Sequence, residues 1–284
     1  MKTIDEAFEV YLGWKTPTDR QRSAAAKHRN SVTSSVTKDL DVYRFIETGS
    51  FTHGTGVAGH SDVDILVSLK ENQPASSDTA LSWIRTALVN TFPNTHVHVS
   101  RPAVVVPFAN GYETFEIIPG FRNDSEIARF SIPAPGGEWM DTTPQAHLDY
   151  VSAANAKPRQ GAKRLARLLK SWKYSQSVPV SSFYLEMRAA QHMRGEETFL
   201  AIADLWSVLE RLDRLDLASM QDPTGNSGLI RATSSPGAAE TARSKTHTAA
   251  VRAKRALDAW RDDDAASSFH YLDLLFNGGF PSRY

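Results

Sequence analysis

Two aspartates in the first quarter of the sequence have the spacing of a metal-binding carboxylate pair. Asp62 and Asp64 open the run Asp-Val-Asp-Ile-Leu-Val-Ser-Leu, which ends at Leu69 and is typical of a buried strand. Alternate side chains of a strand share a face, so the two carboxylates are expected to point the same way, with Cβ atoms roughly 6–7 Å apart. Carboxylates placed in this way can hold divalent metal from one side.

A third acid, Glu116, stands alone within the apolar segment Thr-Phe-Glu-Ile-Ile-Pro-Gly-Phe. A buried carboxylate is costly unless a metal or a partner compensates its charge, so we predict that Asp62, Asp64 and Glu116 form one catalytic metal site. The alternative is that they are ordinary solvated carboxylates, which the apolar surroundings disfavour. Two divalent ions about 3.5–4 Å apart can clamp both oxygens of an in-line phosphoryl displacement. Oxygen ligands suit Mg²⁺, with Mn²⁺ as the substitute ion.

A Gly-Ser pair, Gly49-Ser50, precedes the aspartates, and a glycine-rich stretch connects the two. Residues 54–59 match the pattern G-x-G-x-x-G of dinucleotide-binding proteins. That fingerprint requires a helix directly after the glycines, whereas here the strand from Asp62 follows, so we reject this interpretation. We expect the glycines to shape the turn and to let the backbone approach nucleotide phosphates, with Ser50 donating a hydrogen bond.

A basic stripe in the second half of the chain is the candidate phosphate contact. Lys163, Arg167 and Lys170 recur at steps of three and four in a helical segment without acids. They could be a solvated helix face, but a triphosphate needs counter-charge beyond the metals, and Lys170 is the preferred candidate. Ser182 lies at the start of another helix, as a cap or a phosphate ligand. Phe183 belongs either to the core or to a base-stacking surface.

Two histidines, His96 and His98, alternate along a strand-like segment and raise the question of a second metal site. No third ligand lies nearby in the sequence. We therefore interpret both as ordinary residues of a sheet.

Composition limits the classes of function. The 32 basic and 32 acidic residues of the 284 cancel, so strong general nucleic-acid binding is not expected. The absence of cysteine excludes disulfides, thiolate nucleophiles and cysteine-based zinc ribbons. No leader pattern and no apolar run of the roughly 20 residues needed to cross a bilayer is found, so a cytoplasmic protein without a membrane span is expected.

The elements that must position these residues divide the chain into two parts. The first part is predicted as mixed helix and strand, and the second part as helical from about Thr143. The expected helices lie within 3–41, with a break at 16–19, and at 77–92; the expected strands are 42–48, 62–69, 96–106 with a break at Pro102, and 112–118. A loop-rich passage is expected after Pro119-Gly120. Residues 232–249 are the predicted mobile loop, because they are rich in Ser, Thr, Ala and Gly and contain Pro236.

These residues resemble the CD-NTases of CBASS antiphage systems, the bacterial relatives of cyclic GMP-AMP synthase and oligoadenylate synthetase. Gly49-Ser50 resembles the family's Gly-Ser signature, Asp62 and Asp64 its first two metal carboxylates, and Glu116 its third, which is more often Asp. Lys170 in Leu-Leu-Lys-Ser-Trp and Ser182 in Ser-Ser-Phe resemble contacts to the donor triphosphate, with Phe183 or Tyr184 near the base. Asp222-Pro223 resembles a short segment that these enzymes carry late in the chain.

The resemblance implies an α+β fold with two lobes, a polymerase-β-type nucleotidyltransferase core with a mixed sheet and a helical C-terminal lobe, at 1–142 and 143–284. It also implies an enzyme that joins ribonucleoside triphosphates into a cyclic di- or trinucleotide, binds two Mg²⁺ ions and releases pyrophosphate. The product would act through a downstream effector, and a regulatory protein partner is expected. Nucleotide transfer to a polynucleotide end or a small acceptor, and an inactive nucleotide-binding sensor, are the alternative functions.

Overall fold

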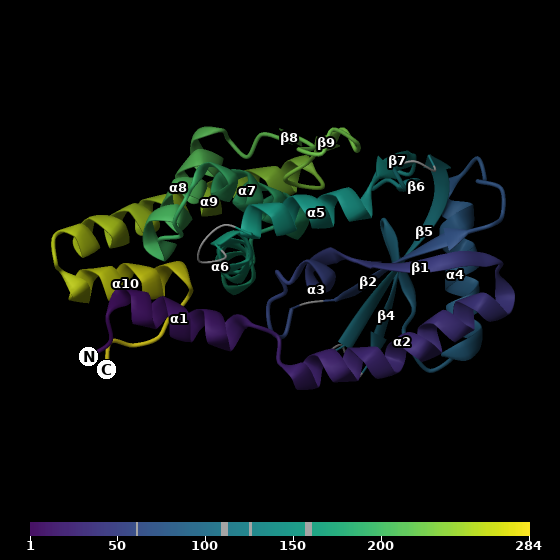
Figure 1. Cartoon of the computed structure of the whole chain (residues 1–284), viewed down its shortest axis with the longest axis horizontal. Helices are drawn as coiled ribbons and strands as arrows, with labels where there is room; N and C mark the ends of the chain where they lie inside the picture. The colour runs from purple at the N-terminus through teal and green to yellow at the C-terminus, as the bar shows by residue number, and fades with distance from the viewer. Residues whose placement is uncertain (61, 109–112, 125–126, 157–160) are drawn as a thin grey trace. The chain divides into compact units, whose positions relative to one another are not determined.

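The computed structural model describes residues 1–60, 62–108, 113–124, 127–156 and 161–284. These residues form two compact units (Figure 1). The sheet unit comprises residues 17–149 and 224–228, and the helical unit comprises 1–16, 150–223 and 229–284. The observed division falls inside helix α5 (Pro144–Asn155), a few residues after the predicted boundary at 142. Residues 1–16, which were predicted to accompany the sheet, belong to the helical unit.

The sheet unit is built on seven described strands. Its main path runs in the order β1-β2-β5-β4-β3, and β6 and β7 extend it from β5. Among the described strands of this sheet, only the pairing of β2 with β5 is parallel. The bounds are β1 Val42–Thr48, β2 Val63–Leu69, β3 His98–Ser100, β4 Ala103–Phe108, β5 Glu113–Asp124, β6 Arg129–Pro133 and β7 Trp139–Thr142.

Helices α2 (Asp19–Asp39) and α4 (Ser77–Thr91) share one core with one face of this sheet. The odd-numbered residues of β2, such as Ile65 and Val67, enter that core together with Phe115 and Ile117 of β5. Leu66 and Ile118 belong instead to a small core that includes residues of β6. The period of two therefore places Asp64 and Glu116 on the face away from α2 and α4.

Strand β5 is longer than predicted. We expected a loop after Pro119-Gly120, but the strand continues to Asp124, and β6 and β7 follow it. Pro119 lies where the strand exchanges one antiparallel neighbour for another: pairing with β4 ends at Ile117, and pairing with β6 begins at Phe121. A residue without an amide hydrogen is tolerated at such a change of partner. Tyr112, the first residue of the predicted strand, lies outside the described residues.

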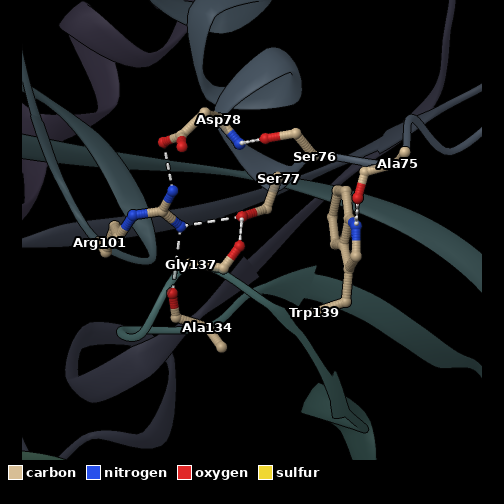
Figure 2. A network of polar contacts seen from close by, with 8 residues as sticks. All are labelled: Ala75, Ser76, Ser77, Asp78, Arg101, Ala134, Gly137 and Trp139. Carbon is tan, nitrogen blue, oxygen red and sulfur yellow. Dashed lines mark hydrogen bonds and ion pairs between the residues drawn. The ribbon is translucent and has the colours of Figure 1, made fainter.

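A polar network holds the start of α4 against two turns of the sheet unit (Figure 2). The Arg101 guanidinium pairs with Asp78 and donates to the Ser77 hydroxyl at 2.9 Å and to the Ala134 carbonyl at 3.1 Å. The Ser77 hydroxyl in turn donates to the Gly137 carbonyl at 2.6 Å. These contacts join the β3–β4 turn, the β6–β7 turn and the first turn of α4.

The helical unit packs around a single large core. Its helices are α1 (Ile4–Lys15), the end of α5, α6 (Gly161–Ser175), α7 (Ser182–Gly195), α8 (Ala201–Arg214), α9 (Pro236–Arg261) and α10 (Ala265–Leu275), and a short hairpin joins β8 (Met220–Gln221) to β9 (Leu229–Ile230). Helix α1 packs on aromatic residues near the end of the chain, with Phe8 and Phe280 ring centres 5.1 Å apart. Among the described residues, no helix combines the length and the apolar character that a bilayer crossing requires.

The prediction of a mobile loop at 232–249 was wrong. Ser235 caps a helix of 26 residues, α9, and Pro236 occupies its first turn. Proline is favoured at that position because the amide hydrogen it lacks has no partner within the helix. The small residues that suggested mobility instead allow close packing, since Ala242, Ala249 and Ala256 are buried in the core of the helical unit.

Candidate active site

The sheet places two of the three predicted acids side by side. Asp64 of β2 and Glu116 of β5 are register partners in the parallel pairing, and both lie on the face away from α2 and α4. Neighbouring strands are about 4.8 Å apart, so the two carboxylates rise from adjacent positions. Both residues are half-buried. The site therefore holds two acids side by side on neighbouring strands of the sheet.

Gly49 lies directly against Asp64. A Cβ added at Gly49 would stand 1.7 Å from Oδ2 of Asp64, and the backbone there has a φ of +69°. Both the space and the conformation require glycine. Thr48, the residue before it, is the register partner of Asp64 in β1. Gly49 is thus part of the wall around the Asp64 carboxylate, and together with Ser50 it opens the short helix α3 (Gly49–His53).

Asp62 stands one residue before β2. In the described part of the chain, no three Asp, Glu or His side chains approach closely enough to hold one ion together. The structure therefore brings Asp64 and Glu116 together, and leaves the participation of Asp62 as a prediction.

The glycine-rich stretch shapes the connection from α3 to β2. Gly54 ends α3 in the left-handed conformation, and Gly59 has a φ of +78° near the turn in which the His60 amide donates to the Val57 carbonyl. A strand and not a helix follows these glycines, which confirms that residues 54–59 are not a dinucleotide fingerprint.

On the helical unit, Lys170 points into the protein core. Only 2% of its side chain is exposed, and its ammonium group forms an ion pair with Glu186, which is equally buried. A buried charge of this kind is held by its counter-charge, because separation would leave both groups desolvated. This burial disfavours a direct contact between Lys170 and a phosphate.

Lys173, one turn further along α6, contacts the predicted phosphate ligand Ser182. Its ammonium group donates to the Ser182 hydroxyl at 2.6 Å and lies 4.8 Å from the ring centre of Tyr174, whose hydroxyl is 3.1 Å from the same Ser182 oxygen. Lys173 is only partly buried. The acid-free helical segment already contained Lys173, but the periodicity could not rank it above Lys170.

The predicted aromatic contacts separate into core and partly exposed residues. Ser181 accepts from the Tyr184 amide and caps α7, so the hydroxyl of Ser182 is not needed as the cap. Tyr184 is fully buried and donates to the Ala218 carbonyl at 2.8 Å; its burial raises the pKa of its hydroxyl. Phe183 packs against the core but remains partly exposed. Of these two aromatics, only Phe183 offers a surface for stacking.

The chain is similar to known proteins both in sequence and in fold. Residues 3–155, just over half of the 284 residues, match the family described as the Second Messenger Oligonucleotide or Dinucleotide Synthetase domain. A curated relative, the cyclic AMP-AMP-AMP synthase of Escherichia coli (strain MS 115-1), is 24% identical over 139 residues. That match spans 47% of this chain and only 43% of the relative.

Solved structures of similar fold cover nearly the whole chain. CdnC of E. coli MS115-1, determined with ATP, has a TM-score of 0.76 at 17% identity over 97% of this chain and 98% of that one. The same protein in its HORMA-deltaN complex gives 0.74 at 18% identity over 97% and 98%. The CD-NTase CdnG of Bradyrhizobium diazoefficiens, in complex with GTP, gives 0.74 at 14% identity over 97% and 99%. The predicted α+β fold is confirmed.

Proposed function

Because the chain belongs to the family of Second Messenger Oligonucleotide or Dinucleotide Synthetase domains, we propose that it condenses ribonucleoside triphosphates into a cyclic di- or trinucleotide for antiphage signalling. Family membership also confirms the resemblance to CD-NTases that the sequence predicted. The observation that carries the proposal is the registered pair of Asp64 and Glu116, with Gly49 closed against Asp64.

The donor set of the acidic site fits magnesium. Asp62, Asp64 and Glu116 supply only carboxylate oxygens, the ligands that Mg²⁺ prefers, and Mn²⁺ accepts the same set. We propose that Asp62 joins the registered pair when two ions are bound. Bound ions would neutralise triphosphate charge and favour in-line displacement at phosphorus.

The chain's own residues have separate roles in the proposed reaction. A ribose hydroxyl oxygen attacks the α-phosphorus, the bond from that phosphorus to the bridging oxygen breaks, and pyrophosphate leaves. Glu116 or its neighbour Asp64 lies closest to the attacking hydroxyl and accepts its proton. On the helical unit, Ser182 and Lys173 bind phosphate oxygens, and Lys173 replaces Lys170 in this role because Lys170 is committed to Glu186. Phe183 offers its exposed edge to a base.

The relatives support the proposed substrates and partners. Structures of CdnC with ATP and of CdnG with GTP support purine ribonucleoside triphosphates as substrates. The complex of CdnC with HORMA-deltaN supports a regulatory protein partner for this chain as well. The cyclic product is expected to act on a separate effector protein.

One assay tests the reaction and its alternatives. The purified chain is incubated with the four labelled ribonucleotides and Mg²⁺, and the products are then treated with phosphatase. A phosphatase-resistant product supports cyclisation, whereas a sensitive chain would indicate tailing and contradict the proposal. The double variant Asp62→Ala and Asp64→Ala should release no pyrophosphate. Asp41→Ala, which removes an exposed carboxylate just before β1, is the matched control and should retain wild-type turnover.

A further inference from the structure

His98, the first residue of β3, lies at the edge of the sheet on the same face as the acids, and His96 lies two residues before it. Strand β3 is the last in the path β1-β2-β5-β4-β3, and His98 pairs with Val105, which pairs with Glu116. The two histidines flank Val97, which is buried on the opposite face with α4. Two strand spacings separate His98 from Glu116, which is about 10 Å between Cα atoms. The pair is therefore near the acidic site but distinct from it.

The two imidazoles are already spaced for chelation. Their ring centres are 5.0 Å apart, and the ring planes differ by 31°. An ion bound at about 2.0–2.1 Å from one nitrogen of each ring, with about 90–110° between the two bonds, places the ring centres about 4.5–5 Å apart. The observed separation lies within this range.

A backbone contact sets which nitrogen of His98 is available. Nδ1 of His98 lies 3.1 Å from the carbonyl oxygen of His96. Because a carbonyl can only accept, Nδ1 carries the hydrogen, and Nε2 of the neutral ring keeps its lone pair. A histidine that binds a metal through one nitrogen commonly donates from the other to a carbonyl in this way. His96 is exposed and His98 is partly exposed, so an ion can reach both rings.

We propose that His96 and His98, which the sequence alone indicated to be ordinary residues of a sheet, bind one first-row transition-metal ion of the class Cu²⁺, Ni²⁺ or Zn²⁺. Within the described residues no third Asp, Glu or His side chain joins them, so water completes the coordination and the ion exchanges readily. Imidazole nitrogen selects these ions, whereas the carboxylates of Asp64 and Glu116 select Mg²⁺ and Mn²⁺. The site is thus separate in chemistry as well as in position, and it does not depend on the proposed nucleotidyl transfer.

The test uses the full chain, freed of metal, with Cu²⁺ and Zn²⁺ as probes. Electron paramagnetic resonance of the Cu²⁺-loaded protein should show two coordinating imidazole nitrogens, and calorimetry should show one Zn²⁺ per chain at this site. His96→Asn and His98→Asn should each weaken Zn²⁺ binding at least tenfold. His270→Asn, which removes an exposed histidine of α10, is the matched control and should leave the affinity unchanged.

A variant of the acidic site separates the two kinds of binding. Asp64→Asn combined with Glu116→Gln should abolish pyrophosphate release but leave the two-nitrogen Cu²⁺ signal intact. Thermal unfolding of each histidine variant checks that the fold is retained. Unchanged Zn²⁺ affinity in both folded histidine variants, or loss of the copper signal with the acids and not with the histidines, would overturn the proposal.

Discussion

At the scale of single residues, the acidic site requires a glycine beside Asp64 as well as the carboxylates themselves. Gly49 leaves room for the Asp64 carboxylate, and no other residue fits, because a Cβ would overlap Oδ2. Lys170 and Lys173 are three residues apart on one helix, yet the first is fully buried and the second is not. Substitutions at these positions therefore test three different things: the room beside Asp64, the charge of Lys173 and the contribution of Lys170 to stability.

We expect Gly49→Ala to lower the rate of pyrophosphate release by at least 100-fold, because the new methyl group must displace Asp64. Gly278→Ala is the matched control: its φ is +77°, but its Cβ would meet no atom within 4 Å. Both variants should lose about 1–2 kcal/mol of stability from the left-handed backbone. Equal turnover in the two variants would show that the contact with Asp64 is unimportant.

The two lysines of α6 should differ in what their loss affects. Lys170→Met removes the ammonium group that pairs with the buried Glu186 and should cost about 3–5 kcal/mol of unfolding free energy. Adding Glu186→Leu should recover most of this loss. Lys173→Met should leave the stability within about 1 kcal/mol but raise KM for nucleotide about tenfold or more, since charge-assisted bonds to phosphate are lost. An unchanged KM in Lys173→Met would contradict the proposed contact between Lys173 and phosphate and would favour Lys170 in that role.

At the scale of elements, polar contacts decide where helices begin and how turns are held. Arg101 is mostly buried and joins three segments, whereas its ionic partner Asp78 has 77% of its side chain exposed. The hydroxyl of Ser235 caps helix α9, and Pro236 is the first residue of the helix. Both features predict effects that can be measured without any assay of activity.

Arg101→Met should destabilise the sheet unit by about 1.5–3 kcal/mol, because the Ala134 carbonyl and the Ser77 hydroxyl lose a charged donor. Asp78→Asn should cost no more than about 1 kcal/mol, since the ion pair it weakens is exposed on one side. Denaturant unfolding measures both values, and hydrogen exchange should show faster opening around 134–139 in Arg101→Met. Equal costs for the two variants would contradict this division of roles.

Ser235→Ala should lower the unfolding free energy by about 1 kcal/mol, because the amide of Ala238 loses its cap. Ser244→Ala, an exposed position inside the same helix, should instead be neutral or slightly stabilising, since alanine is the better helix former. Limited proteolysis tests the same element: residues 236–261 should resist cleavage. Rapid cutting there would favour the loop that the composition had suggested.

At the scale of the whole molecule, the helical unit should be the part that is sensitive to alkali. Burial raises the pKa of Tyr11, Tyr150 and Tyr184, and all three belong to this unit. A raised pKa in the folded state means that the unfolded chain releases the proton first. The stability from these groups is therefore complete below pH 10, the ordinary tyrosine pKa, and declines above it.

Tyr11→Phe isolates the largest contribution, because burial raises the pKa of the Tyr11 hydroxyl far above its usual value. Between pH 10 and 11.5 the wild type should lose about 1.4 kcal/mol per pH unit more than this variant. Denaturant unfolding of both proteins at pH 8 and at several alkaline values gives the difference. Parallel pH profiles would contradict the assignment. Tyr43→Phe, which removes an exposed hydroxyl of β1, should follow the wild type.

The local sequence pattern was sufficient to predict the bounds of most helices and strands in the first half of the chain. Strand β1 matches its predicted bounds, β2 and α4 lie within one residue of theirs, and the break at Pro102 separates β3 from β4. Periodicity, proline and glycine act on residues that are close in the sequence, so their effects can be predicted from the sequence alone. The exceptions were β5 beyond Pro119 and helix α9, where a change of strand partner and the packing of small residues prevailed over local composition.

The sequence by itself determined that acids, a Gly-Ser pair and basic residues occur in a pattern suited to nucleotide chemistry. Only the tertiary structure decided that Asp64 is the register partner of Glu116, that Gly49 closes on Asp64, and that Lys170 turns inward while Lys173 meets Ser182. Strand order and register are set by packing between segments far apart in the chain. Residue types and spacing therefore predict which groups can do chemistry, but long-range packing selects the ones that meet.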